Sequence, residues 1–269
     1  MTTAATQAHN GANAWSTARN STPFLQIRGL CKQFGGIQAL RDIDLDIYPG
    51  EVLGLLGDNG AGKSTLIKSI SGVYIPTSGT MQCEGKSVSI SSPNVARSLG
   101  IETVFQDLAL IPNLDAAANL FIGREIGWFK GLLRVMNQRA MLEDVKKTLD
   151  QLDIHIPSLR LDVEGFSGGQ RQAIAIARAI RWKAKLVILD EPTAALSVPE
   201  QRKVLALTRQ LASQGVAVIY ITHNILDVIA VTDRLAILHR GRKAAEIATK
   251  DCDEHEIVSL IMGKSKPSI

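Results

Sequence analysis

The feature that most constrains the fold of this chain is a glycine-rich loop, Gly57–Thr65, that directly follows an apolar run, Val52–Leu56. The loop reads Gly-x-x-x-x-Gly-Lys-Ser, a spacing in which glycines let backbone amides wrap around phosphate groups. Lys63 would bring a full positive charge to the terminal phosphates, and the Ser64 hydroxyl is short enough to ligate Mg²⁺. A helix from Lys63 would add the positive end of its dipole. The sequence therefore predicts a strand, a phosphate-binding loop and a helix, rather than a chance glycine-rich turn. The predicted phosphate-binding residues are Gly57, Asp58, Asn59, Gly60, Ala61, Gly62, Lys63, Ser64 and Thr65.

Three more apolar runs have the same character as Val52–Leu56, namely Ile101–Phe105, Leu186–Leu189 and Val216–Ile221. Runs without polar alternation suit parallel strands that are covered on both faces. Polar groups follow each of them: Gln106, Asp190-Glu191 and Thr222-His223. Ligands of open α/β sheets bind at the carboxyl ends of the strands, so these strand ends predict one shared site.

Shorter segments of alternating polarity flank these runs. They are Leu25–Leu30, Ile43–Ile47, Thr80–Cys83, Ser87–Ile90, Leu235–Leu238 and Lys243–Ile247. Gly50, Gly79, Gly85 and Gly241 separate them as turns. We therefore predict antiparallel strands beside the parallel core.

The pattern becomes helical after Gln106. Apolar residues recur at helical spacing within Met141–Leu152, and Asn137 is a suitable N-cap for this helix. We predict a helical lobe, about residues 107–180, inserted into the core, with a loop at Gly123–Gly131 within it.

Length and composition agree with one large domain that carries an inserted lobe. The chain has 269 residues, of which 45% are hydrophobic. We predict a domain over residues 23–263, between a disordered tail at 1–22 and a short tail at 264–269. The net charge of +4 does not demand nucleic acid or a membrane surface. The three cysteines show no Cys-x-x-Cys spacing, which fits a reducing cytosol, and no apolar run approaches the ~20 residues that cross a bilayer.

An acidic pair, Asp190 and Glu191, ends the third apolar run. Alone, such a pair could be a helix cap or surface charge. Near a phosphate loop the two have separate tasks, because Asp190 can orient Mg²⁺ through its water shell and Glu191 can polarise an attacking water. The pair therefore predicts hydrolysis of the bound nucleotide.

A second glycine-rich helix start, Ser167-Gly168-Gly169-Gln170, lies between the phosphate loop and the acidic pair. Ser167 and Gln170 fit a capping box, so a well-capped helix explains these two residues. It does not explain Gly168 and Gly169, which are poor helix formers. Paired glycines make sense where a phosphate must approach the backbone. Because this segment has no lysine of its own, it suggests a contact with the nucleotide of another chain.

The phosphate loop, Ser167–Gln170 and the acidic pair follow one another along the chain in the order found in the ATP-binding-cassette (ABC) ATPases. The chain therefore resembles this family, and Ser167–Gln170 resembles its ABC signature. The resemblance covers nearly everything from Phe24 to Gly263. It implies an α/β fold: a P-loop NTPase (ABC ATPase) core with an antiparallel β subdomain and an inserted α-helical subdomain. It also implies ATP and Mg²⁺, and two copies that pair head to tail. Each ATP would then lie between the phosphate loop of one copy and Ser167–Gln170 of the other.

The resemblance implies roles for three further residues. His223, by default a core histidine, matches the family's switch histidine, whose neutral imidazole could donate to the γ-phosphate. Gln106 matches the glutamine loop, which completes the Mg²⁺ and water shell and touches the membrane subunit. Phe34 matches the adenine-stacking aromatic; the alternative is an ordinary hairpin aromatic. The implied catalytic residues are thus Glu191, His223, Lys63 and Gln106, and the implied Mg²⁺ ligands are Ser64, Gln106 and Asp190.

One position departs from the family pattern. Relatives usually carry aspartate shortly after the catalytic glutamate, in a loop that signals across the dimer, whereas this chain has Ser197. With Pro199 between them, Ser197 and Glu200 make a capping box for a helix over Val198–Leu211. The local structural role is therefore kept, while the charge that would carry the signal is missing.

The residues around the motifs are most similar to bacterial monosaccharide importers of the ribose, xylose and fructose kind. The resemblance rests on Glu191–Leu196, Thr222–Asn224 and Arg240–Lys243, and the single cassette resembles the fructose type. It implies an ATP-hydrolysing subunit, peripheral on the cytoplasmic face of the inner membrane. Its implied partners are integral membrane permease subunits, a second ATP-binding subunit and, indirectly, a periplasmic sugar-binding protein.

Two alternatives stay open: a cassette for another transported substrate, and a soluble ABC ATPase that acts on nucleic acid or ribosomes. The soluble kind usually needs a long coiled-coil insert or a second cassette, and the sequence has the features of neither. The modest charge also argues against a nucleic-acid partner.

Overall fold

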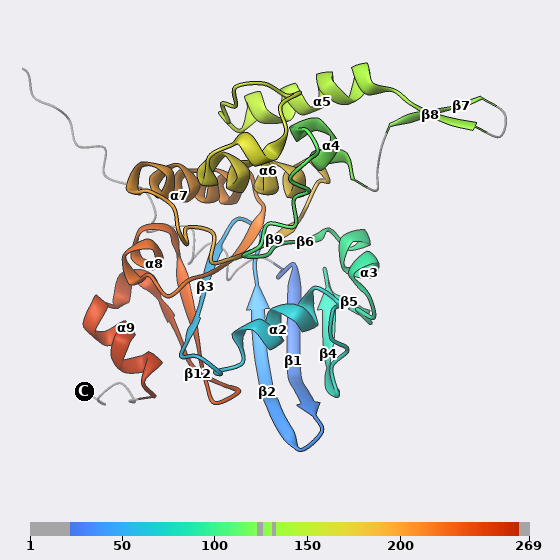
Figure 1. Cartoon of the computed structure of the whole chain (residues 1–269). Coiled ribbons are helices and arrows are strands. Elements are labelled where there is room, and N and C mark those ends of the chain that lie inside the picture. The colour runs from blue at the N-terminus through green and yellow to red at the C-terminus, as the bar shows by residue number, and fades with distance from the viewer. Residues whose placement is uncertain (1–21, 123–125, 131–132, 264–269) are drawn as a thin grey trace, which may run out of the picture.

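The computed structural model describes residues 22–122, 126–130 and 133–263. A six-stranded sheet lies at its centre, with the strand order β12-β11-β3-β10-β9-β6 (Figure 1). Its strands are β3 (Val52–Gly57), β6 (Ile101–Val104), β9 (Leu186–Asp190), β10 (Ala217–Ile221), β11 (Arg234–His239) and β12 (Arg242–Ala248). The strands from β6 to β11 pair in parallel. The four predicted core strands are therefore confirmed.

The prediction for Leu235–Leu238 was wrong in its direction. These residues lie in β11, which pairs in parallel with β3 and antiparallel with β12. Leu235 and Ile237 pack on one face against α8 (Ile225–Val231) and α9 (Glu254–Ile261). Ala236 and Leu238 pack on the other face into the main core. Since both faces are covered, β11 is a fifth parallel core strand.

A second, four-stranded sheet is antiparallel throughout, as predicted. Its order is β2-β1-β4-β5. The strands are β1 (Leu25–Phe34), β2 (Ile37–Ile47), β4 (Ser78–Cys83) and β5 (Lys86–Val88). Buried residues of β1 share one apolar cluster with β3 and with α2 (Lys63–Ile70). This packing fixes α2, and hence the end of the phosphate loop, relative to both sheets.

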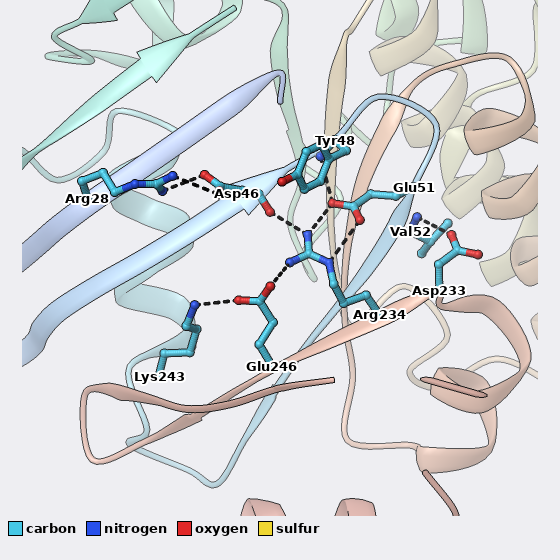
Figure 2. A network of polar contacts seen from close by, with 9 residues as sticks. All are labelled: Arg28, Asp46, Tyr48, Glu51, Val52, Asp233, Arg234, Lys243 and Glu246. Carbon is cyan, nitrogen blue, oxygen red and sulfur yellow. Dashed lines mark hydrogen bonds and ion pairs between the residues drawn. The ribbon is translucent and has the colours of Figure 1, made fainter. Parts of the chain in front are cut away.

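A buried arginine ties the two sheets together (Figure 2). Arg234 of β11 and Glu51, which precedes β3, are each 1% exposed. Arg234 Nη2 donates to Glu51 Oε1 at 2.6 Å and to the Asp46 carbonyl of β2 at 2.6 Å. Arg234 Nη1 donates to Glu246 Oε1 of β12 at 2.6 Å. The guanidinium thus fixes β2, β11, β12 and the start of β3 at one point.

The elements between β6 and β9 are mostly helical and lie together at one end of the molecule (Figure 1). They are α4 (Ala116–Phe121), β7 (Gly127–Lys130), β8 (Leu133–Met136), α5 (Gln138–Gln151), η1 (Val163–Gly165) and α6 (Gly168–Arg181). Asn137 caps α5 as predicted, because its Oδ1 accepts a hydrogen bond from the Ala140 amide at 3.1 Å.

The loop predicted for Gly123–Gly131 is not a loop throughout. Its residues 127–130 form β7, which pairs antiparallel with β8, while 123–125 and 131 lie outside the described residues. Aromatic residues such as Trp128 and Phe129 favour strands, and this propensity outweighed the flanking glycines.

The other helical elements are α3 (Pro93–Ser98), α7 (Val198–Ser213) and η2 (Thr249–Asp251). Within the described residues, no helix combines the length and apolar character that a bilayer crossing requires. The predicted terminal tails lie outside the described part of the chain, apart from Thr22.

Candidate functional site

The phosphate loop connects the end of β3 to the first turn of α2. Gly57 has a φ of 148° and Gly62 a φ of 107°, a region that favours glycine. A Cβ on Gly57 would collide with the Leu238 carbonyl oxygen, and one on Gly62 would lie 3.0 Å from the Ala39 carbonyl oxygen. Both glycines are therefore required by the fold itself as well as by the loop shape.

The Lys63 side chain folds back over this loop. Its Nζ donates to the carbonyl oxygens of Gly57 at 2.6 Å and Asp58 at 3.2 Å. The ammonium group is thereby held on the loop by two of the loop's own carbonyl oxygens. A cradle of glycines closed by one cation fits a nucleotide phosphate chain.

The carboxyl ends of the parallel strands bring the other predicted residues to the same edge of the sheet. Asp190 ends β9, and its register partner Ile221 ends β10, directly before Thr222 and His223. Burial and the neighbouring Glu191 carboxylate raise the pKa of Asp190, against the opposing effect of Lys63 and Lys68. Since β3 and β9 both pair in parallel with β10, the phosphate loop and Asp190 lie at the same edge of the sheet, as a shared site requires.

Glu191 and His223 are in direct contact. His223 Nδ1 lies 3.0 Å from the Glu191 carboxylate. Glu191 has a φ of 51°, a left-handed conformation that is uncommon for a residue with a Cβ. Its amide donates to the Ile221 carbonyl oxygen at 2.8 Å, which holds this turn against the end of β10. The imidazole is 85% exposed, so it is free to meet a ligand.

A buried group that the sequence analysis missed supports this pair. Thr193 Oγ1 donates to Asp227 Oδ2 of α8 at 2.6 Å, and Tyr220 of β10 lies beside them. The contact joins the segment after Glu191 to the helix after His223. An aspartate within the apolar helix sequence Ile225–Val231 was the signal that could have revealed it.

Gln106 lies two residues beyond the end of β6, and its side chain is exposed. The next residues turn sharply, with φ values of 58° at Leu108 and 45° at Ala109. Arg178 of α6 donates to both of their carbonyl oxygens, at 2.9 and 2.8 Å. Arg178, which the sequence analysis missed, therefore fixes the Gln106 loop to α6. A groove beside this loop is lined by Arg97, Glu102, Thr103, Arg178 and Trp182, among others.

Phe34 lies at the end of β1 and is 40% exposed. Its ring centroid is 5.0 Å from that of Tyr74 in an edge-to-face contact, and Lys32 Nζ lies 5.0 Å from the Phe34 centroid. Tyr74 was not singled out from the sequence. The pair forms an aromatic surface with one ring accessible to a flat ligand.

The segment Ser167–Gln170, which we call the α6 tip, is the capping box that the sequence predicted. Ser167 Oγ accepts from the Gln170 amide at 3.2 Å, and Gln170 Oε1 accepts from the Ser167 amide at 3.0 Å. For Gly169, the structure gives a further reason why glycine is needed, which the sequence analysis missed. A Cβ on Gly169 would lie 2.8 Å from Glu200 Cγ, so close packing inside the chain also demands this glycine.

The predicted helix start at Ser197 is also present. The Ser197 amide and hydroxyl both donate to Glu200 Oε2, at 3.1 and 2.8 Å. The helix α7 therefore begins with its first turn tied to Ser197, as the sequence predicted.

Comparison with known proteins agrees with this geometry. The sequence model of the ABC transporter family matches residues 40–194, which span the phosphate loop, the α6 tip and the acidic pair. This chain belongs to the ABC transporter family. The α/β P-loop fold predicted from the sequence is confirmed, and as a family member the chain is an ATP-binding and ATP-hydrolysing protein.

Relatives within the ABC transporter family match this chain along nearly its whole length. The xylose/arabinose import ATP-binding protein XylG of Sulfolobus acidocaldarius is 49% identical over 237 residues, which cover 88% of this chain and 93% of that protein. The fructose import ATP-binding protein FrcA of Rhizobium meliloti is 44% identical over 253 residues, 91% of this chain and 96% of that protein.

A solved ABC cassette has the same fold. It is a dimeric ATP-binding cassette in a post-hydrolysis state, bound to ADP and Pi. It superposes with a TM-score of 0.69 at 25% identity and covers 84% of this chain and 98% of that chain.

Proposed function

We propose that this chain is the ATP-hydrolysing subunit of an ABC importer for a monosaccharide such as fructose or ribose. The observation that carries the proposal is the contact between Glu191 and His223, at the edge of the sheet where the Lys63 loop and Asp190 also lie. Near full-length likeness to sugar import proteins supports the substrate class. The roles below are parts of this proposal.

The backbone amides of Gly57–Thr65 and the Lys63 ammonium hold the phosphates of ATP. Ser64, Asp190 and Gln106 hold Mg²⁺, which when bound neutralises the phosphate charge that grows during phosphoryl transfer. The donor set fits, because Mg²⁺ prefers a few protein oxygens completed by phosphate and water.

Glu191 polarises the attacking water, and His223 orients Glu191. An ionised carboxylate only accepts hydrogen bonds, so His223 Nδ1 donates to it and the Nε2 of a neutral ring is left without a proton. To donate to a phosphate oxygen through Nε2, the ring must take up a proton or turn away from Glu191. The exposed imidazole is free to make either change.

Two copies pair so that each ATP is held by the phosphate loop of one copy and the α6 tip of the other. Phe34 stacks on the adenine. The dimeric state of a solved cassette with the same fold supports this arrangement. After hydrolysis and phosphate release, the γ-phosphate charge no longer attracts the α6 tip of one copy to the phosphate loop of the other, and the dimer opens.

The helical segment, about residues 107–180, passes this movement to integral membrane permease subunits. The groove beside the Gln106 loop is the proposed contact, because Arg178 links that loop to α6. The chain is then peripheral on the cytoplasmic face of the inner membrane. A periplasmic sugar-binding protein takes part indirectly, through the permease.

Purification of the native complex tests this function. We expect the chain to co-purify with a polytopic membrane protein, and its ATP hydrolysis to rise when a sugar-loaded binding protein is added. A chain that remains free of membrane proteins and shows salt-sensitive binding to DNA would contradict the proposal.

A further inference from the structure

The α6 tip already holds a carboxylate from its own chain. The Gly169 amide donates to Glu200 Oε1 at 3.2 Å. The other oxygen of the same carboxylate accepts from the Ser197 amide at 3.1 Å and from the Ser197 hydroxyl at 2.8 Å. One side chain therefore joins the start of α6 to the start of α7.

The tip is shaped to let an anion approach its backbone. A Cβ on Gly169 would lie 2.8 Å from Glu200 Cγ and 3.0 Å from Glu200 Oε1, so only glycine admits the carboxylate at this position. Amides in the first turn of a helix lack partners within the helix and lie at the positive end of its dipole. Glu200 thus occupies the kind of position that helix N-termini offer to phosphates.

The carboxylate keeps its negative charge at neutral pH. Hydrogen bonds from the Ser167 side chain, from the side chain and amide of Ser197, and from the Gly169 amide lower the pKa of Glu200 to about 2. A phosphate that arrives at the tip therefore meets a like charge at the Gly169 amide.

We propose that Glu200 competes with the partner's ATP for the α6 tip and so sets the ATP affinity of the closed dimer. The inference rests on the proposed function, in which the tip binds the ATP of the second copy. The phosphate replaces Glu200 Oε1 at the Gly169 amide. Glu200 Oε2 keeps both donors of Ser197, so α7 retains its N-terminal contacts while the tip is released.

The unusual serine of this chain fits such a movement. Ser197 supplies a hydroxyl donor to Glu200 at 2.8 Å. An aspartate there would lack this donor and would place a second negative charge beside Glu200, so it would hold the carboxylate less firmly. Ser197 thus gives the displaced carboxylate a place to stay, and it lies on the loop that joins Glu191 to α7.

The full chain with Glu191→Gln, which we expect to bind ATP and to hydrolyse it slowly, provides the test. Sedimentation velocity over a series of ATP concentrations gives the half-point, which is the ATP concentration at which half of the chains are dimeric. Adding Glu200→Gln keeps the size of the side chain and removes its charge. We expect the half-point to fall about two- to fivefold, the effect of one charge at a helix end. The difference should shrink at high salt, because exposed charges are screened, whereas loss of a purely structural cap would leave the half-point unchanged or raise it.

A matched control is Glu256→Gln, added to the same Glu191→Gln chain. Glu256 caps α9 in the same way, since its Oε2 accepts from the Asp253 amide at 3.2 Å, but it belongs to another helix start. We expect this change to leave the half-point where it was. Glu200→Asp is a second variant at the tip: it keeps a charge but is shorter by one methylene, so the half-point should fall less than with glutamine.

Two results overturn the inference in distinguishable ways. If the Glu191→Gln chain stays monomeric at every ATP concentration, the proposed ATP-bound dimer is wrong and the role of Glu200 falls with it. If that chain dimerises but the Glu200 variants need the same or more ATP, the dimer stands and Glu200 is only a helix cap.

Discussion

His223 Nδ1 lies 3.0 Å from the carboxylate of Glu191, and the two residues follow adjacent parallel strands, β10 and β9. Because carboxyl ends of parallel strands share one edge of a sheet, a pair far apart in sequence meets at the edge where the phosphate loop also begins. This relationship supports Glu191 as the residue that activates water.

Glu191→Gln should retain ATP binding and lose most turnover. Glutamine keeps the shape and accepts a hydrogen bond from His223, but it is a very poor base. We expect kcat to fall about 10²- to 10⁴-fold, the usual contribution of a general base. Measuring kcat together with the equilibrium affinity for ATP checks this, and near-normal hydrolysis by a clean mutant would rule out Glu191 as the main base.

Asp190→Asn should stabilise the nucleotide-free chain at neutral pH. Burial and Glu191 raise the pKa of Asp190 above its ordinary value of 3.8. The folded state therefore binds the proton more tightly than the unfolded state, and stability falls as pH rises through this window. Asparagine carries no such penalty. Thermal unfolding over a pH series should show a higher Tm for the variant than for the unmodified chain at pH 7, and this difference in Tm should shrink as pH approaches 3.8. A difference in Tm that is independent of pH would mean that the buried charge of Asp190 is not its cause.

Arg234→Met should strongly destabilise the fold. It leaves Glu51, itself 1% exposed, as a buried charge without its guanidinium partner (Figure 2). Breaking one side of a buried pair costs about 3–5 kcal/mol. The free energy of unfolding in urea measures this loss.

Arg28→Met is the matched control, because Arg28 pairs with Asp46 in the same view but is 47% exposed (Figure 2). It should cost about 0–1 kcal/mol. Equal losses for the two variants would mean that the buried pair has no special role.

Arg178→Gln should loosen the Gln106 loop. It removes the charged donors to the carbonyl oxygens of Leu108 and Ala109. Hydrogen exchange should become faster at the amides of residues 107–110. Arg139→Gln, at a pair whose arginine is 91% exposed, should leave exchange at that loop unchanged. Unchanged protection in the Arg178 variant would show that other contacts fix the loop.

Local signals explain what could be predicted from the sequence. The Gly57–Thr65 loop and the capping boxes at Ser167 and Ser197 depend on residues a few positions apart, so spacing alone reveals them. The direction of β11 was predicted wrongly, because it depends on which strand lies beside it rather than on its own residues.

Long-range contacts explain what could not be predicted. Glu200 meets Gly169 from 31 positions away, and Arg234 meets Glu51 from 183 positions away. Nothing in the local sequence of either pair indicates its partner. Sequence reasoning therefore found Gly169 but assigned its small size to phosphate approach alone, and it passed over Arg234.

Steady-state ATP hydrolysis by a Gly168→Asp variant, measured over a range of protein concentrations, tests the shared site most directly. A Cβ at position 168 would lie 2.9 Å from Leu196 Cδ2, the end of a flexible side chain that can shift, and the Gly168→Asn control carries the same Cβ. An aspartate in the first turn suits a helix start, so the fold should persist, but its charge repels a phosphate at the α6 tip. With Gly168→Asn as the uncharged control, we expect the aspartate variant to bind ATP and to lose hydrolysis. We also expect the specific activity of the unmodified chain to rise with its concentration. Full activity of the aspartate variant, independent of concentration, would contradict a site built from two copies.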